Sequence, residues 1–281
     1  MDTLAYMIEM RRHLHRMPEL SLQEKETAAF IREQLKALGY EPVAIADTGT
    51  YTDFIVDPEK PWLLFRADID ALPVTEETGL PFASEHPGKM HACGHDGHTS
   101  MLLGAARAFK LGELKSAYNL RFAFQPAEEI SIGALSMIDA GALDGVDAIY
   151  GAHIWSEVPA GTVSCAPGQR MANTDWFRID IDGVSAHGSM PHKGVDAVVV
   201  GAEMVAALQV LVSRDVSPFE PVVVTVGEFH GGEARNIMAG HAWLTGTVRT
   251  WSERLRSEVP DRLERIVSRI AHAFGAKARF T

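Results

Sequence analysis

The stretch PWLLFRADID, residues 61–70, decides the fold, because an apolar run passes directly into two aspartates. The stretches YNLRFAFQPAEE, residues 118–129, and DAIYGAHIW, residues 147–155, have the same form. Each is typical of a buried strand that ends in polar residues. Between the first two, GHTSMLLGAARAFK, residues 97–110, carries apolar side chains at helical spacing. This alternation predicts an α/β domain whose central sheet is flanked by helices.

Two further helices are predicted before these strands. Residues 2–16 have apolar side chains at helical spacing, which predicts an amphipathic helix. The stretch SLQEKETAAFIREQLKALGY, residues 21–40, predicts a second helix. There, Ser21 and Glu24 are expected to form a capping box, and Gly39 is expected to end the helix.

The polar residues of the first part fall at one predicted edge of the sheet. In open α/β sheets, ligands bind at the carboxyl ends of the strands. The residues predicted at such ends are Asp68, Asp70, Glu128, Glu129 and His153. Cys93 and His95 lie in the loop just before the predicted helix, and we expect them at the same edge. Separate stretches of sequence therefore converge on one location.

From residue 169 the pattern changes to that of a second domain. Predicted strands and helices follow in the order β-α-β-β-α-β, which is the split βαβ pattern of a ferredoxin-like sandwich. The strands are NTDWFRIDIDG, PVVVTVGEFHGG, HAWLTGTVRT and AKARFT, with helices near residues 194–212 and 252–274. The sequence thus predicts two domains, residues 1–168 and 169–281.

Net charge, apolar runs and the N-terminal segment argue against some classes of protein. The formal net charge of −11 argues against binding to nucleic acid, because phosphate backbones require basic patches. No run of about 18 apolar residues predicts a membrane-spanning helix. The N-terminus lacks the basic start and apolar stretch of a secretory signal. With only two cysteines in 281 residues, we expect a cytoplasmic protein without structural disulfides.

The stretch MHACGHDGH, residues 90–98, contains three histidines, a cysteine and an aspartate. Thiolate and imidazole two residues apart suit zinc, nickel, manganese or cobalt better than calcium. Three interpretations are open for this stretch: a structural zinc site, a catalytic metal site and a nucleophilic cysteine. A structural zinc usually needs a second short Cys/His motif, and none is present. A nucleophilic Cys93 would have a base and a helix N-terminus nearby.

The adjacent pair Glu128 and Glu129 favours the catalytic metal site. The pair follows a buried strand and a proline, where solvated surface charge is less expected. At a metal site one carboxylate can bind the ion while the other moves a proton. Metal-assisted hydrolysis is therefore the favoured class of reaction.

Five motifs together resemble a known family: RADIDALP, GKMHACGHDGH, QPAEE, GAHIW and SAHGSMPHKGVDAV. In this combination and order the chain resembles the M20 metallopeptidase superfamily. It is most similar to the amidohydrolase branch, which includes aminoacylases, hippurate hydrolases, auxin-conjugate hydrolases and N-acetyldiaminopimelate deacetylases. The resemblance implies a metal-dependent amidohydrolase that cleaves the amide of a small N-acyl amino acid.

The resemblance also implies roles for individual residues in the first domain. It implies two divalent metal ions, of zinc, manganese, nickel or cobalt. By position, the metal ligands are Cys93, His95, Glu129 and His153. Glu128 matches the general base that takes a proton from a metal-activated water. Asp68 matches the acid that supports the base and its neighbouring ligand.

For the second domain, the resemblance implies a lid that also forms a homodimer. His187 matches a lid histidine that stabilises the oxyanion of the tetrahedral intermediate. Asn236, in EARNIMA, and Arg249, in GTVRT, are similar to lid residues that bind the carboxylate end of the substrate.

The sequence departs from the family pattern in two places. Ile130 and Ser131 follow the glutamate pair where the family has a glycine-rich turn. The 281 residues also lack the segment by which the family returns to the catalytic domain, including its final metal-binding histidine. Three alternatives therefore stay open: a non-catalytic dimerising remnant, a carboxypeptidase or dipeptidase of the same superfamily, and a cysteine-nucleophile acyltransferase.

Overall fold

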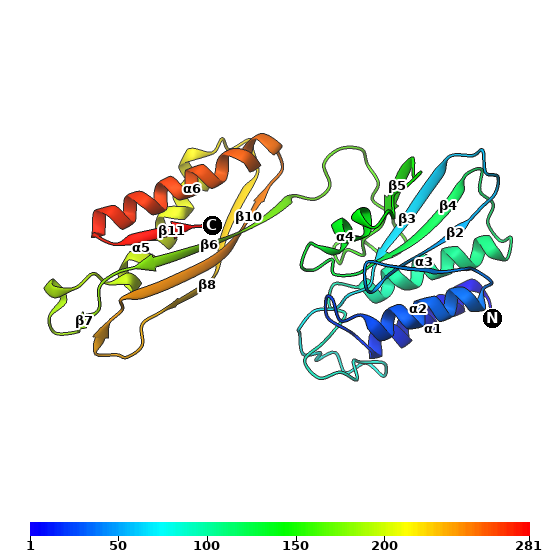
Figure 1. The fold of residues 1–281 in the computed structure, drawn as a ribbon, viewed down its shortest axis with the longest axis horizontal. Coiled ribbons are helices and arrows are strands. Elements are labelled where there is room, and N and C mark those ends of the chain that lie inside the picture. The colour runs from blue at the N-terminus through cyan, green and yellow to red at the C-terminus, as the bar shows by residue number, and fades with distance from the viewer. The chain divides into compact units, whose positions relative to one another are not determined.

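Two separate sheets organise the chain, and the computed structural model describes residues 1–281 (Figure 1). The first unit comprises Met1–Val163 and the second Ser164–Thr281, so the division falls five residues before the predicted one. Each unit has its own hydrophobic core. The two are therefore described separately.

The first unit contains a five-stranded mixed sheet with the strand order β1-β2-β4-β3-β5. Strands β3, β4 and β5 run parallel, whereas β2 is antiparallel to both β4 and β1. The predicted central sheet flanked by helices is confirmed. The elements are α1 (Thr3–Arg16), α2 (Lys25–Ala37), β1 (Val43–Ile45), β2 (Gly49–Phe54), β3 (Trp62–Asp68), α3 (His95–Lys110), β4 (Asn119–Gln125), α4 (Gly133–Asp139) and β5 (Ala148–Gly151).

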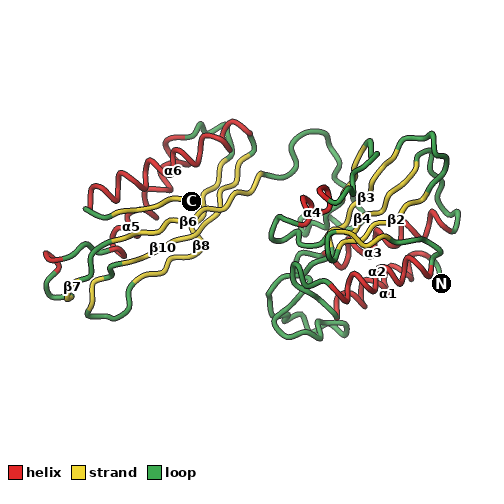
Figure 2. The backbone as a smooth tube through the Cα atoms, viewed as in Figure 1, coloured by secondary structure: helices red, strands yellow, loops and turns green.

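The alternation along β4 shows how the sequence places helices on both faces of this sheet. Leu120, Phe122 and Phe124 point to one face and pack in a core with side chains of α1, α2 and α3. Ala123 points to the other face and packs with Met137 of α4. The region between β3 and α3 contains no helix or strand, and Figure 2 shows it as a long loop.

The second unit has the predicted β-α-β-β-α-β order. Its four-stranded antiparallel sheet has the strand order β11-β6-β10-β8, the arrangement of a ferredoxin-like sandwich. The elements are β6 (Asn173–Asp182), β7 (Ala186–His187), the 3-10 turn Pro191–Lys193, α5 (Ala197–Val210) with a π-helical end (Leu211–Asp215), β8 (Val222–Gly231), β9 (Ile237–Met238), β10 (His241–Thr250), α6 (Glu253–Phe274) and β11 (Lys277–Phe280).

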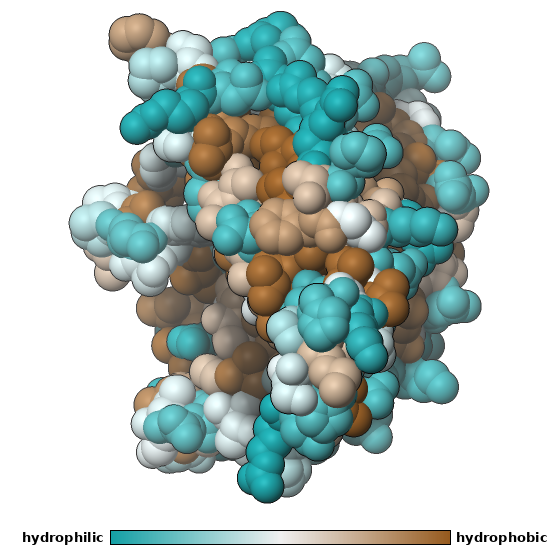
Figure 3. All heavy atoms as spheres, turned by 90° about the vertical axis from the view of Figure 1, so that its left-hand side faces the viewer, coloured by the Kyte–Doolittle hydropathy of each residue, from teal (hydrophilic) through white to brown (hydrophobic).

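Helices α5 and α6 cover one face of this second sheet. Met204 and Leu208 of α5 and Leu263 of α6 are fully buried against it. The helical stretch 197–215 is long and apolar enough to span a membrane. Buried core helices have the same length and composition, so this feature alone is weak evidence for a membrane span. Figure 3 looks onto this unit and shows apolar residues gathered on a face bordered by hydrophilic ones.

The capping-box prediction for α2 is wrong. The helix begins at Lys25, and the side chain of Glu24 does not cap it. Ser21 donates a hydrogen bond to Asp70 instead, and the Glu24 carboxylate accepts from Thr48 and Ala127. Tertiary partners thus replace the local ones that the spacing predicts. The predicted end is confirmed, because Gly39 has a φ of +80° and Tyr40 N–H donates to Leu35 C=O.

Two elements of the first unit have no clear sequence signal. The turn between β1 and β2 places Ala46 and Asp47 at positive φ, where glycine or asparagine is the usual marker. Helix α4 has only seven residues, too few for a helical period to show. The sequence therefore predicts neither the turn nor α4.

A buried charged network attaches α1 to the start of α3. His15 binds Asp96 through Nδ1 at 2.8 Å and Glu76 through Nε2 at 3.2 Å. Arg11 also donates to Asp96, at 3.2 Å. The hydrogen bond to Asp96 raises the pKa of His15 and outweighs the opposing effect of burial. Folding therefore favours the charged imidazolium.

We expect the stabilisation by His15 to disappear at alkaline pH. Because the pKa is raised in the folded state, the contribution is complete below the unfolded value of about 6.5 and is lost as the pH rises through the folded value. At pH 6, His15→Gln should lower the free energy of unfolding by about 1–2 kcal/mol. Urea unfolding at pH 6 and pH 9 measures this difference. A difference that grows towards pH 9 contradicts the assignment.

Candidate metal centre and active site

The parallel strands β3, β4 and β5 end at one edge of the first sheet. Asp68 lies directly opposite Gln125, and Arg66 lies opposite Gly151. The residues that follow each strand therefore emerge side by side, as the sequence predicts. They meet the first turn of α3, which begins at His95 after Gly94, a glycine at a φ of +89°. His95 thus lies in the helix rather than in the loop before it.

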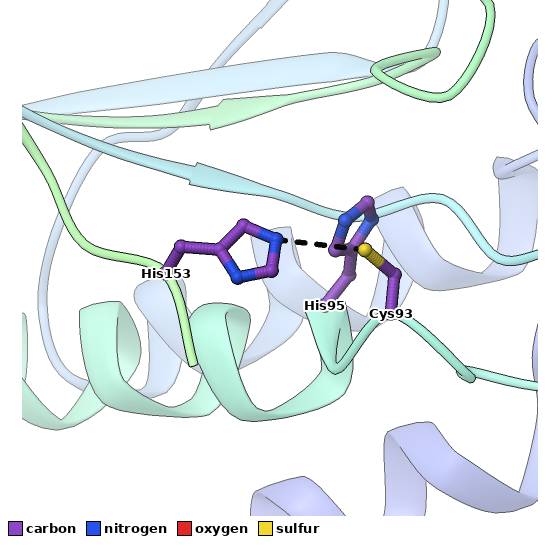
Figure 4. Close-up of side chains that lie close together, drawn as sticks. All are labelled: Cys93, His95 and His153. Atoms are coloured by element: carbon purple, nitrogen blue, oxygen red, sulfur yellow. Dashed lines mark hydrogen bonds between the residues drawn. The ribbon is translucent and has the colours of Figure 1, made fainter. Parts of the chain in front are cut away.

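Three groups of potential metal ligands lie at this edge, and His95 belongs to all of them. They are Cys93 with His95 and His153, Asp68 with His95 and His98, and His95 with Glu128 and Glu129. Within each group, the ligand atoms lie within 4.8 Å of one another. Figure 4 shows Cys93, His95 and His153 pointing toward one another, with 3.5 Å between Cys93 Sγ and His153 Nε2. The structure thus brings together all four predicted ligands.

Two buried atoms in the cluster have no hydrogen-bond partner. These are His95 Nε2 and Glu129 Oε1, which lie 3.7 Å apart. A buried polar atom without a partner costs about 1–3 kcal/mol. The other ring nitrogen of His95, Nδ1, donates to the Asp70 carbonyl at 2.9 Å. In the neutral ring, Nε2 therefore carries the lone pair, and this nitrogen is directed at the carboxylates, as a metal ligand requires.

The electrostatics of the cluster also favour a cation. Burial alone would lower the pKa of His95, but Asp70, Cys93 and Asp68 raise it to about 11. Burial raises the pKa of Glu129, which the neighbouring His95 partly offsets. The raised pKa of His95 reflects the acidic groups around it, and the raised pKa of Glu129 reflects a site that is largely shielded from water. Thiol, imidazole and carboxylate donors in this arrangement fit a divalent transition-metal ion.

His98 is not free to bind a metal in this arrangement. Its Nε2 accepts the backbone N–H of Ile154 at 2.9 Å, so the proton lies on Nδ1. Nδ1 then donates to Asp68 Oδ1 at 2.5 Å. Both ring nitrogens are used, and His98 ties Asp68 to the loop that carries His153. The remaining histidine of the motif, His91, is buried with both nitrogens unpaired, and burial lowers its pKa to about 4.

Asp68 is fully buried and held on several sides. Arg66 donates to its Oδ2 at 2.6 Å, and His95 Nε2 lies 3.7 Å from the same oxygen. Burial would raise the pKa of Asp68, but His98, His95 and Arg66 together hold it below its ordinary value. The carboxylate is therefore kept ionised beside the candidate ligands.

Asp70 has a part in the site that the sequence did not reveal. Its carbonyl accepts from His95, and its Oδ2 accepts the backbone N–H of Glu129 at 3.1 Å. Ser21 donates to the same oxygen at 2.7 Å. Asp70 thus orients two candidate ligands at once. The only available signal was its place at the end of a strand, two residues after Asp68.

Glu128 and Glu129 are adjacent but differently exposed. The side chain of Glu129 is 20% exposed and that of Glu128 is 40% exposed, while both reach within 4 Å of His95 Nε2. They follow Ala127, which has a φ of +49°, and precede Ser131, which has a φ of +61°. Non-glycine residues at such angles cost of order 1–3 kcal/mol each. The turn thus holds a strained backbone on both sides of the glutamate pair.

The candidate lid residues belong to the second unit. His187 in β7 pairs with Ile237 of β9, and Gly188 N–H donates to the Asn236 carbonyl, so His187 and Asn236 are neighbours. His187 Nδ1 accepts the backbone N–H of Ser189 at 3.2 Å, which leaves the proton of the neutral ring on Nε2. Arg249 lies near the other end of β10, where it donates to Thr174. Within this unit, the structure does not place Arg249 next to His187 and Asn236.

The sequence profile of Peptidase family M20/M25/M40 matches residues 64–273. The chain belongs to this family. The predicted resemblance to the amidohydrolase branch is confirmed by its relatives. It is 43% identical over 274 residues to an N-acetyl-L-cysteine deacetylase of Bacillus subtilis (97% of this chain, 66% of the relative). It is 46% identical over 275 residues to an N-acyl-L-amino acid amidohydrolase of Geobacillus stearothermophilus (97% and 74%).

A solved structure supports the fold and the metal centre. The YXEP protein of Bacillus subtilis, described as a dinuclear metal-binding peptidase of family M20, superposes with a TM-score of 0.81 at 36% identity. The match covers 99% of this chain and 73% of that one. The chain thus spans about two thirds to three quarters of the length of these relatives. The predicted enzyme class, a metal-dependent hydrolase of linear amides, is that of its family members.

We expect His95→Ala to abolish tight binding of divalent metal, because His95 is common to all three groups. Elemental mass spectrometry after dialysis against metal-free buffer measures the metal content per chain. His192→Ala, an exposed histidine in the second unit, is the matched control and should keep the wild-type content. Equal metal content in both variants contradicts the proposed centre.

Proposed function

We propose that this chain hydrolyses the amide bond of N-acyl amino acids, with Glu128 as the general base. The observation that carries the proposal is the contrast between the two adjacent glutamates. Glu129 has a buried, unpaired oxygen directed at His95, as suits a ligand. Glu128 reaches the same histidine but stays open to solvent, as suits a group that exchanges protons.

The proposed metal ligands are Cys93, His95, Glu129 and His153, which would hold two divalent ions of zinc, manganese, nickel or cobalt. Such ions would supply Lewis acidity, polarising the acyl carbonyl and lowering the pKa of a nearby water. The unpaired buried atoms and the mixed sulfur, nitrogen and oxygen donors support this assignment. The description of the YXEP protein as dinuclear also supports it.

Glu128 would take a proton from the attacking water onto Oε2, the oxygen that lies 3.8 Å from His95 Nε2. It would then give this proton to the amide nitrogen as the carbon–nitrogen bond breaks, releasing a carboxylic acid and an amine. Asp68 would keep its negative charge throughout, because His98 and Arg66 hold it in place. Its charge would hold the neighbouring histidine in position.

The lid residues would bind the substrate. His187 would donate from Nε2 to the oxyanion, since its Nδ1 already accepts from Ser189. Asn236, which neighbours His187, would bind the free carboxylate of the amino acid. Arg249 lies near the other end of β10, so its predicted contact with the same carboxylate would have to come from the second copy in the proposed homodimer. Arg249 is exposed, and its planar fork suits a carboxylate. The relatives named as deacetylase and amidohydrolase of N-acyl amino acids support this substrate class.

We also propose a cytoplasmic homodimer that forms through the second unit. Both cysteines are unpaired, as expected in a reducing compartment. Val198, Val199 and Val210 of α5 are exposed, and β8 is an unpaired edge strand. Sedimentation equilibrium should give twice the mass of 30.7 kDa. A monomer at micromolar concentration contradicts the dimer.

We expect Glu128→Gln to lower kcat by about 10²–10⁴-fold, the usual contribution of general-base catalysis, because the amide cannot accept the proton. Assays of N-acetyl-L-cysteine, N-acetyl-L-methionine and N-benzoylglycine with the zinc- and manganese-loaded chain measure this effect. Metal content should stay at the wild-type level.

The same assays separate the alternatives. Cleavage of dipeptides but not of N-acyl amino acids would indicate the peptidase alternative. Activity that survives chelators but not thiol alkylation would indicate Cys93 as a nucleophile. Absence of turnover in a metal-loaded wild type would indicate a non-catalytic chain. Full turnover in Glu128→Gln would exclude this residue as the base.

A further inference from the structure

The segment PELSLQE, residues 18–24, lies far from the glutamate pair in sequence but binds Asp70 and Ala127, the residues that hold the turn of this pair. Leu20 forms a parallel bridge with Ala71, and Ser21 donates to Asp70 at 2.7 Å. At the other end of the segment, Glu24 reaches the turn that carries Glu128 and Glu129. None of the proposed catalytic steps uses these contacts.

Glu24 is a fully buried carboxylate with two uncharged partners. Its Oε1 accepts the backbone N–H of Ala127 at 2.8 Å, and its Oε2 accepts the Thr48 hydroxyl at 2.9 Å. A buried carboxylate is costly unless it is hydrogen-bonded, so both contacts constrain its position. Glu24 is the N-cap residue of α2, but its side chain makes no capping hydrogen bond and binds the turn instead.

Ala127 is the point at which the turn needs support. It is buried and has a φ of +49°, an angle that alanine adopts only when its surroundings enforce it. Two residues later, Glu129 N–H is held by Asp70. Glu128 therefore lies between two residues whose backbone N–H groups are each bound by a buried carboxylate, Glu24 on one side and Asp70 on the other.

We propose that Glu24 is a positioning residue for Glu128: by binding Ala127 N–H, it fixes the left-handed backbone that directs the base. The proposal rests on the proposed function, because it concerns the same base. The Glu24 carboxylate forms no hydrogen bond with the candidate ligands or with the side chain of Glu128. Its effect passes through the backbone of Ala127.

The proposal predicts different effects for three variants. Glu24→Ala removes the acceptor and should lower kcat by about 100-fold, as expected for a misplacement of about 1 Å, with KM and metal content unchanged. Glu24→Gln should restore kcat to within a few-fold, because its amide oxygen can accept from Ala127 while its NH₂ group donates to Thr48. Should Glu24→Ala not fold, Glu24→Asp, which is one methylene shorter, gives the same comparison.

Glu19→Ala is the matched control in the same segment. Glu19 is also a buried carboxylate, but it accepts from Thr27 in α2 and does not contact the turn. This variant should lose stability and keep kcat. An equal loss of kcat in Glu19→Ala and Glu24→Ala would overturn the proposal, because it would show a general effect of destabilisation. A wild-type kcat in Glu24→Ala would overturn it as well.

A second measurement does not depend on activity. Amide hydrogen exchange of Ala127 in the metal-free chain, followed by NMR, should be at least 10-fold faster in Glu24→Ala and near wild type in Glu24→Gln and Glu19→Ala. Unchanged exchange in Glu24→Ala overturns the proposal. If the wild type hydrolyses none of the N-acyl amino acids, the proposed function fails, while the exchange rates still decide whether Glu24 holds the turn.

Discussion

The hydrogen bond from His95 Nδ1 to the carbonyl of Asp70 is the contact on which the rest of the site depends. It fixes the tautomer of the one residue that all three donor groups share. In the neutral ring the proton lies on Nδ1, and the lone pair of Nε2 then faces the carboxylates of Asp68, Glu128 and Glu129 at 3.7–3.8 Å. The opposite tautomer would direct an N–H into that space and leave no ligand there.

The site had to be assembled from distant parts of the sequence, and the topology explains how. Three parallel strands end at one edge, so residues near positions 68, 128 and 153 become neighbours. Helix α3 adds its first turn to the same edge. This convergence could be predicted from the sequence, because a buried strand that passes into acidic or histidine residues is a local pattern. The four predicted ligands are close together because they follow these strands or lie at the start of α3.

The supporting contacts could not be predicted in the same way. Ser21 and Glu24 have the spacing of a capping box, yet each binds a partner that is distant in sequence. Asp70 and His98 gain their roles only when the strand end meets the first turn of α3 and the loop of His153. No local pattern encodes such partners, because they lie 24 to 103 residues away in the chain.

The turn that begins at Ala127 shows how a strained backbone can give two identical side chains different environments. In a regular extended strand, Glu128 and Glu129 would point to opposite faces and could not both approach His95. Strand β4 ends at Gln125, the positive φ of Ala127 then turns the chain, and both carboxylates reach within 4 Å of the same nitrogen. Asp70 accepts a hydrogen bond from the backbone N–H of Glu129, whose side chain is half as exposed as that of Glu128. A ligand and a base can thus be adjacent in sequence, provided that the backbone between the strand and the pair is held in a conformation that alanine would otherwise avoid.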